Sequence, residues 1–307
     1  MATTMGTGDF QKLVYPKPFT SWIGLGYTMV PDMVPMVFNV KSSDQSVEEI
    51  TILEGLGTMV PTSEGESTPY DSLSQGLTKR VTHADYRLAF SVTKNLIRDG
   101  KAFSITEKGA TELGKSYTET RNRIAFNFME NLFTSGYTSA DGAIAISASH
   151  PTSVGNMSNV LSTAAALSEA SLEQLITQMK DIKNGRGFRI RMRAQKLIVP
   201  AELEFEAHRI LMSNLRVGTP DNDPNALKDM RKIPGGFSVV DYLDDTTAYY
   251  LLTDQSTDGL TFFDRQGLEV NNDTHFDTDN FRVKSHARMS VTIGEWRHIL
   301  GSEGTGG

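Results

Sequence analysis

Residues 104–133 read SITEKGATELGKSYTETRNRIAFNFMENLF and have the pattern of one long amphipathic helix. Ser104 and Glu107 have the spacing of an N-terminal capping box, and Ser135-Gly136 follows as a stop signal. The apolar residues of the helix recur three, four or seven positions apart on one stripe: Ala110, Leu113, Tyr117, Ile124, Phe128 and Leu132. About 28 residues at ~1.5 Å each give a rod of roughly 40 Å, which predicts a structural spine over about 105–133.

The same segment contains a complete match to a phosphate-binding motif. Residues 109–116, GATELGKS, fit the P-loop pattern G-x-x-x-x-G-K-[ST], and Asp241 is a weak candidate for holding Mg²⁺. A P-loop requires a strand that ends at the first glycine, whereas here the helical stripe already includes Ala110 and Leu113. Glu112 would also place a carboxylate in the anion cradle. A nucleotide-binding enzyme therefore stays only a remote alternative.

An arm of residues 1–45 precedes the helix. It contains four prolines: Pro16, Pro18, Pro31 and Pro35. Because no helical period survives this spacing, we expect the arm to be extended. Its apolar side chains are frequent, so it should lie on another surface, either of the same chain or of a neighbour.

A long acidic segment lies between the arm and the helix. Two strand-like segments flank the polar sequence PTSEGESTPYDSLSQGL: 47–60 and 86–92. Residues 42–78 contain seven acidic residues and no lysine or arginine. One interpretation is a solvated loop. The other is a projecting hairpin over 46–95 whose acidic side, including Glu64 and Glu66, meets a basic partner surface, since two isolated strands cannot bury an apolar face.

A second helix and a basic segment follow the spine. The helix is expected at about 171–183, where Ser171 and Gln174 form a capping box. Beyond it, three arginines alternate with apolar residues and would project from one face of a strand: Arg189, Arg191 and Arg193. Such groups repel one another unless an acidic surface faces them. Three interpretations stay open: a solvated face, an acidic surface of a neighbouring subunit, or packaged nucleic acid.

The C-terminal part is rich in strand patterns. In the last predicted strand one face is apolar: Phe281, Val283, Ala287, Met289, Val291 and Ile293. The other face is basic: Arg282, Lys284, His286 and Arg288. This alternation predicts one buried and one polar face. The tail 301–307, GSEGTGG, is expected to be disordered.

The composition excludes several classes of function. The 307 residues include 37 acidic and 30 basic side chains, a net charge of −7, which disfavours tight binding to the nucleic-acid backbone. Cysteine is absent, which excludes disulfides, thiolate metal sites and a cysteine nucleophile and fits a reducing cytoplasm. The six histidines lack metal-ligand spacing, and no G-x-S-x-G motif occurs. No apolar run approaches the ~20 residues of a membrane span, and the start has no signal-peptide pattern. We therefore predict no catalytic, cofactor or metal site and no membrane contact.

The order of these features resembles the major capsid proteins of tailed bacteriophages, in particular those like the Mu-type major head subunit. The segments that carry the resemblance are DYRLAFSVTKNLIRDG at 85–100, the pair His150-Pro151, KLIVPAELEFEAHRIL at 196–211 and GLTFFDRQGLEV at 259–270. The similarity extends over roughly 45–300 and rests on the order and spacing of soft motifs. It implies an α+β fold of the Hong Kong 97 type.

The resemblance also implies a map of the chain: an N-terminal arm at 1–45, an extended loop at 46–95, a peripheral domain at 96–150 and 262–300, an axial domain at 151–261, and the tail. Relatives that cross-link their shells carry a lysine in the extended loop. Here the first lysine of the loop is Lys79, near its base, so cross-linking is not inferred.

The implied function is structural and not enzymatic. Copies of the chain would form hexamers and pentamers of an icosahedral shell that encloses phage double-stranded DNA, in a virion assembled in the bacterial cytoplasm. An encapsulin-like nanocompartment that encloses enzymes is the alternative. Because the chain begins almost directly with the arm, a separate scaffold protein or prior cleavage is implied. Portal and decoration proteins and weak contact with packaged DNA are implied as well, and no cofactor is.

For the acidic loop, the implied receptor is the adjacent subunit. Its basic surface is either on the last strand, at Arg282, Lys284 and Arg288, or at Arg189, Arg191 and Arg193. We favour the last strand, because the resemblance places it in the peripheral domain.

Overall fold

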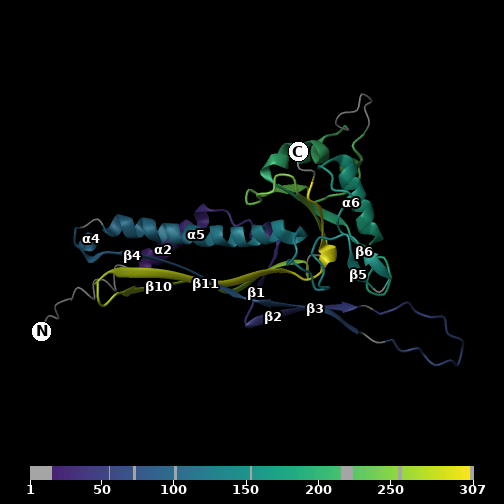
Figure 1. The fold of residues 1–307 in the computed structure, drawn as a ribbon, viewed down its shortest axis with the longest axis horizontal. Helices are drawn as coiled ribbons and strands as arrows, with labels where there is room; N and C mark the ends of the chain where they lie inside the picture. Colours follow the sequence, from purple (N-terminus) through teal and green to yellow (C-terminus); the bar gives the residue numbers. More distant parts are fainter. Residues whose placement is uncertain are drawn as a thin grey trace.

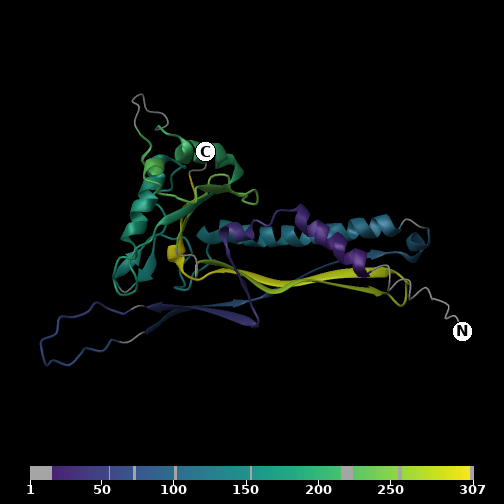
Figure 2. The same cartoon turned by 180° about the vertical axis from the view of Figure 1, so that it is seen from behind.

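The computed structural model describes residues 16–54, 56–71, 74–99, 102–152, 154–215, 224–254 and 258–304. The chain forms a long layer, in which helix α5 (Ala102–Glu130) lies along a sheet, and a compact part at the C-terminal end of that helix (Figure 1). A two-stranded hairpin projects past the compact part, on the side away from helix α2 (Pro16–Met29) (Figure 2). The molecule is therefore elongated, and its hairpin lies largely clear of the rest of the chain.

The predicted spine helix is confirmed. Helix α5 continues into a short 3-10 turn, η1 (Asn131–Phe133), and is preceded by α4 (Lys94–Arg98). It begins before the predicted cap, so Ser104 lies inside its first turn and the predicted capping box is wrong. Its fully buried residues near the C-terminal end are Ala125, Phe126 and Met129. Phe128, which was predicted on the buried stripe, is only half-buried because it lies beside that buried face and lines an open groove at the surface.

The prediction of an extended arm is wrong over Pro16–Val37. This segment forms helix α2 and the short helix α3 (Val34–Val37). The prolines lie in first helical turns (Pro16, Pro18 and Pro35) or after a helix end (Pro31). A first turn tolerates proline because its N–H groups have no partner inside the helix. Part of the arm's apolar surface covers the chain's own body, since Ile23 packs beside Ala110 and Leu113 of α5, while Leu25 and Met29 stay about half exposed.

Helices α2 and α5 cross in close backbone contact. A Cβ atom added at Gly26 would lie 2.0 Å from a carbonyl oxygen of α5, and one at Gly114 would lie 2.3 Å from the carbonyl oxygen of Ile23. A Cβ atom at Gly109 would lie 2.8 Å from the Phe90 ring. Both glycines of the P-loop match are therefore packing positions inside a helix. The nucleotide-binding alternative is wrong, because no strand-loop-helix cradle exists there.

Gly114→Ala is expected to lower the free energy of unfolding by about 1–3 kcal/mol. The clash with the α2 backbone outweighs the gain of ~1 kcal/mol in helix propensity. Denaturant unfolding of the isolated subunit measures the change. Lys115→Ala is the matched control, because the Lys115 amine only pairs at the surface with Glu112 (Nζ to Oε1, 2.8 Å), and its effect should stay within ~0.5 kcal/mol. Wild-type stability in Gly114→Ala would show that the two helices do not cross closely.

The long sheet has the strand order β1-β10-β11-β4. Its strands are β1 (Asn39–Ser42), β4 (Ala84–Val92), β10 (Leu260–Thr274) and β11 (Phe281–Ile293). Strand β11 pairs antiparallel with both neighbours, and β1 pairs parallel with β10. The alternation predicted for the last strand is confirmed, because Val283, Ala287 and Met289 are buried while Arg282 and Lys284 are exposed.

The projecting hairpin consists of β2 (Val47–Glu54) and β3 (Ser74–Thr82), which pair antiparallel from Val47↔Thr82 to Glu54↔Ser74. The predicted hairpin over 46–95 is too long at its C-terminal end, because 84–92 is strand β4 of the long sheet. The physical reason is burial. Phe90 on β4 packs in the same apolar cluster as α5, whereas a two-stranded hairpin offers no covered face.

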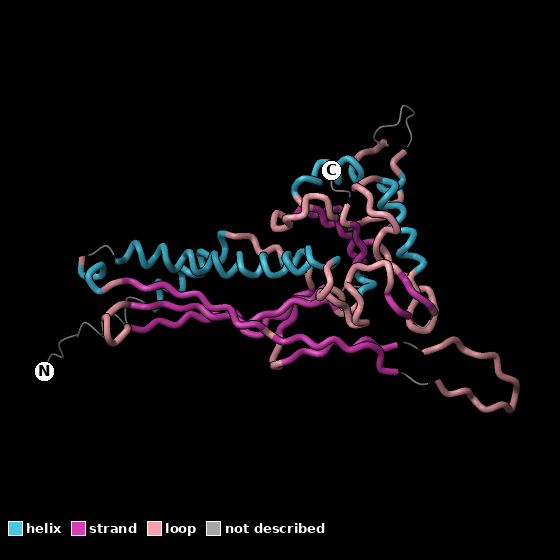
Figure 3. The backbone as a smooth tube through the Cα atoms, in the orientation of Figure 1, coloured by secondary structure: helices cyan, strands magenta, loops and turns pink. Residues whose placement is uncertain are grey.

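The compact part is built on a second sheet of order β12-β9-β7-β8 (Figure 3). Its strands are β7 (Ala194–Val199), β8 (Phe237–Val239), β9 (Tyr249–Thr253) and β12 (Ile299–Ser302). The other elements of this part are β5 (His150–Thr152), β6 (Gly155–Met157), α6 (Glu169–Asp181), η2 (Ala201–Leu203), α7 (Glu204–Met212), α8 (Ala226–Asp229) and η3 (Trp296–His298). A single apolar core joins the sheet to α6 and α7.

Two predictions for this part need correction. The cap of α6 is Ser168, whose Oγ accepts the Ser171 N–H at 3.2 Å, so Ser171 is the third residue of the helix and not its cap. The tail is not disordered at 301–304, because Gly301 and Ser302 are buried in β12. Its small residues allow close packing: a Cβ atom at Gly304 would lie 2.3 Å from the Thr247 carbonyl oxygen. Residues 305–307 lie outside the described residues.

Candidate functional site: the projecting hairpin and the charged surfaces

Within the described ranges, no helix combines the length and the hydropathy of a membrane span. The same residues contain no group of three or more His, Cys, Asp or Glu side chains placed to hold a metal ion. The prominent features of the surface are the outer part of the hairpin and several exposed charged groups.

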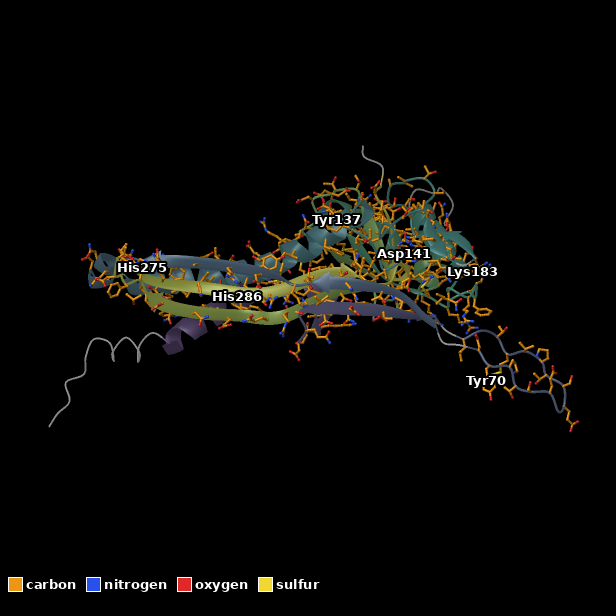
Figure 4. The ribbon with its side chains drawn as sticks, turned by 60° about the horizontal axis from the view of Figure 1, so that its bottom comes forward. Tyr70, Tyr137, Asp141, Lys183, His275 and His286 are labelled. Atoms are coloured by element: carbon orange, nitrogen blue, oxygen red, sulfur yellow. The ribbon has the colours of Figure 1, made fainter. Side chains whose placement is uncertain are left out.

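The outer part of the hairpin, residues 56–71, is exposed along its whole length. Met59 and Tyr70 are 100% and 99% exposed, and Figure 4 shows Tyr70 far from the body of the molecule. Glu66 closes a turn at the tip, because its carboxylate accepts the Ser63 N–H at 2.9 Å. Large apolar side chains without cover in their own chain favour a contact with another molecule over a merely solvated loop.

The base of the hairpin is held to the long sheet by a chain of hydrogen bonds. The His83 ring bridges Ser43 (Nε2 to Oγ, 3.1 Å) and Ser290 (Nδ1 to Oγ, 3.0 Å). The Ser43 hydroxyl also donates to Glu48 on β2. Burial lowers the pKa of the His83 imidazole, with the Glu48 carboxylate opposing this shift and Arg288 favouring it. A neutral imidazole therefore links both ends of the hairpin to β11.

Two further contacts fix the direction of the hairpin. The Lys79 amine donates to the carbonyl and hydroxyl oxygens of Thr138 at 2.9 and 2.8 Å, and burial lowers the pKa of Lys79. The Asp71 carboxylate accepts the Gly57 N–H at 2.8 Å and receives Arg186 Nη1 at 3.1 Å on each oxygen. Because Arg186 belongs to the compact part, the hairpin is tied to that part beyond its own base.

The three predicted arginines lie in an extended segment before β7 and not in a strand, because pairing with β9 begins only at Ala194. The predicted alternation nevertheless holds, since Met192 and Ala194 are buried between the exposed side chains. Arg189 pairs with Asp181 of the same chain (Nη2 to Oδ1, 3.0 Å). No ion pair to Arg191 or Arg193 is found in the part of the chain that the structure describes.

The second predicted basic surface lies on the face of the long sheet opposite α5. Arg282 and Lys284 are exposed there. Arg288 already pairs with Asp85 of β4 (Nε to Oδ1, 2.8 Å). Figure 4 shows His286 of the same face far from Tyr70 of the hairpin. Among the described residues, no ion pair joins Glu64 or Glu66 to either basic surface, and each surface stays a candidate for contact with another copy.

A buried ionic centre at Arg121 was not among the predicted sites. The guanidinium, 5% exposed, donates through Nη1 to both Asp264 oxygens at 2.6 Å and lies 3.3 Å from Asp32 Oδ2. Burial opposes its charge, but hydrogen bonding and the charge of Asp264 outweigh burial and raise the pKa of Arg121. The signal was present in the sequence, because position 121 falls on the apolar stripe, four residues after Tyr117 and three before Ile124.

A second buried network joins the end of the spine to the compact part. His150 Nδ1 lies 2.6 Å from Asp141 Oδ2, and the imidazole stacks on Trp296 at 4.1 Å between ring centroids. Burial opposes ionisation of Asp141, but hydrogen bonds from His150 and Ser139 outweigh it and lower the pKa of the carboxyl. Asn159 Nδ2 donates to carbonyl oxygens on three segments, including that of Ile299. His150 is thus a packing residue.

Comparisons with known proteins identify what the chain resembles. The profile of one family, described as phage capsid protein, matches residues 76–301. No curated protein matches the sequence. The structure is similar to that of a virus-like particle from Pyrococcus furiosus, with a TM-score of 0.55 and 10% identity over 94% of this chain and 99% of that one.

Two bacteriophage structures show the same likeness. The procapsid of bacteriophage JBD30 has a TM-score of 0.53 and 14% identity, over 99% of this chain and 77% of that chain. The capsid of Myoviridae phage XM1 has a TM-score of 0.51 and 10% identity, over 90% of this chain and 92% of that chain. At these identities the likeness shows a shared fold.

Proposed function

The chain belongs to the phage capsid protein family and is a capsid structural protein of the Hong Kong 97 fold, and on this premise we propose that it is the major head subunit, whose copies form the hexamers and pentamers of an icosahedral shell around double-stranded DNA. The structural observation that carries the proposal is the outer part of the hairpin. Its exposed apolar side chains have no cover in their own chain, and a neighbouring subunit supplies such cover in a shell.

The alternatives are less well supported. The family match does not favour an encapsulin-like nanocompartment, and the likeness to the Pyrococcus furiosus particle shows the fold alone. The proposal includes the absence of enzymatic activity, assembly in the host cytoplasm, and a place in the virion capsid. It also includes a separate scaffold, a portal and decoration proteins as partners, and weak non-specific contact with packaged DNA. The net charge of −7 supports weak contact, because DNA that must leave a shell cannot be held tightly.

We propose that the acidic hairpin tip docks on the exposed face of the long sheet of an adjacent copy. Arg282 and Lys284 support this choice, because they are exposed on that face. Arg288 contributes less, since Asp85 already neutralises it. An exposed ion pair contributes only about 0–1 kcal/mol, but a closed shell repeats each contact in every copy.

Replacing Glu64 and Glu66 by lysine is expected to lower shell yield and to change the stability of the subunit by at most about 1 kcal/mol, because Glu66 closes only an exposed turn at the tip. The substitutions place like charges opposite the basic sheet face, and assembly of the wild type should also weaken as salt screens charges over ~8–10 Å. Electron microscopy of assembled particles and thermal unfolding of subunits are the two measurements. Glu119→Lys with Glu173→Lys makes the same charge change on the exposed sides of α5 and α6 and serves as the control. Full shell yield with unchanged salt dependence would contradict this docking.

A further inference from the structure

A groove of about 800 Å³ lies between the C-terminal half of α5 and strands β4 and β11. Half-buried apolar and aromatic side chains line it: Tyr86, Ile124, Phe128 and Tyr137. Phe128 and Tyr137 pack edge to face, with ring centroids 5.5 Å apart. These rings are partly open to solvent in the single chain. A partner that covered them would make the buried aromatic contacts that are typical of the centre of a protein interface.

The rim of this groove is acidic. Asp241 and Asp244 are exposed in the segment after β8, and Glu130 ends α5 beside them. Among the described residues that line the groove, three are acidic and only Arg123 is basic. The groove therefore suits a partner that carries arginines together with an apolar side chain, because arginine pairs with carboxylates and also stacks on aromatic rings.

A segment of this chain has that chemistry. Residues 188–193 carry Phe188, which is 39% exposed, followed by the exposed Arg191 and Arg193. The Arg193 N–H donates to Asp254 at 3.0 Å, and Met192 is buried, so the backbone is anchored while the charged side chains point outward. In the described part of the chain, neither Arg191 nor Arg193 is found in an ion pair.

We propose that the segment 188–193 of one subunit docks in the acidic aromatic groove of an adjacent copy. This proposal rests on the proposed shell function. It adds a second pair of contacting surfaces to the first pair, which is the hairpin tip and the exposed face of the long sheet. Opposite charges would bring the surfaces together, and Phe188 would extend the apolar floor. Packaged nucleic acid could also attract the arginines, but it would not use the acidic groove.

The two surfaces lie apart within one chain. Figure 4 shows Tyr137, which lines the groove, and Lys183, which precedes the segment, well apart on the compact part. A contact between two different surfaces of identical chains is head-to-tail, and it forms a ring when the rotation closes. The proposed contact is therefore of the kind that builds a closed ring of subunits.

Charge reversal on each surface tests the docking. One variant carries Arg191→Glu and Arg193→Glu, a second carries Asp241→Lys and Asp244→Lys, and a third carries all four substitutions. The positions are exposed, so the subunits should fold, as measured by circular dichroism and thermal unfolding. Each paired variant should lose at least about tenfold in shell yield, and the fourfold variant should recover to within about twofold of the wild type, because the charges again attract.

The outcomes separate this docking from the proposed function. Paired variants that form shells as well as the wild type, or a fourfold variant as defective as either pair, overturn the docking and leave the function standing. If the variant with Arg191→Glu and Arg193→Glu assembles normal shells but no longer binds a DNA duplex, the arginines contact nucleic acid. That outcome also overturns the docking. Wild-type subunits that form no shells even when their scaffold is present overturn the proposed function. In that case sedimentation of the same variants decides whether the two surfaces form smaller oligomers, and a strictly monomeric wild type overturns the docking too.

Discussion

Arg121→Met is expected to lower the free energy of unfolding of the subunit by about 3 kcal/mol, the low end of the range for removing one partner of a buried ion pair. Methionine retains much of the aliphatic volume but leaves Asp264 of β10 and Asp32 of the arm without a counter-charge. The low end applies because these carboxylates are 25% and 22% exposed and keep some contact with water. Denaturant unfolding of isolated subunits measures the loss.

The double variant Arg121→Met with Asp264→Leu separates the ion pair from its surroundings. It should recover part of the loss, because the main cost of the single variant is an uncompensated carboxylate. A further control is Arg87→Met, since Arg87 pairs at the surface with Asp85 and its loss should cost at most about 1 kcal/mol. A loss below ~1 kcal/mol in Arg121→Met itself would contradict a central role for this ion pair.

Phe126→Ala is expected to cost about 3–5 kcal/mol of stability and to give insoluble or unassembled protein. Phe126 is fully buried at the point where three parts of the chain meet. Its ring packs edge-on against Phe38 of the arm, with centroids 5.9 Å apart, and stacks on Tyr242 of the compact part at 6.1 Å. Truncation therefore opens a cavity between the arm, the spine and the compact part.

Phe128→Ala is the matched control, because it makes the same change two residues later on the same helix. Phe128 is half-buried at the groove, so its loss should cost only about 1–2 kcal/mol. Thermal and denaturant unfolding compare the two variants. Equal losses would show that the helix register at this end differs from the one described. The comparison also tests which side of the helix is buried, because the apolar stripe of the sequence includes Phe128 and not Phe126.

The elements that the sequence could predict are those whose signal is local. The spine helix and the alternation of β11 follow from periods of 3.6 and 2 residues within one segment, and both are confirmed. The exposed acidic tip could be predicted as well, because 56–71 contains too few apolar residues to form a core of its own. Even the buried Arg121 had a local signal, a charge at a position of the apolar stripe.

The failed predictions concern places where a distant segment decides the outcome. Pro16 and Pro18 are compatible with a helix start, but only the surface of α5 beside Gly114 stabilises α2 as a helix. Segment 84–92 has the alternation of either a hairpin arm or a sheet strand, and β11, about two hundred residues later, selects the sheet.

The same holds for the C-terminal tail. Its composition predicts disorder, but Gly301 and Ser302 fill a narrow space beside β9. Local periodicity therefore determined the type of the long elements and the exposed acidic character of the hairpin. The pairing of strands, the arm and the buried end of the chain were decided only in the tertiary structure, because burial depends on which remote surface is available to cover a segment.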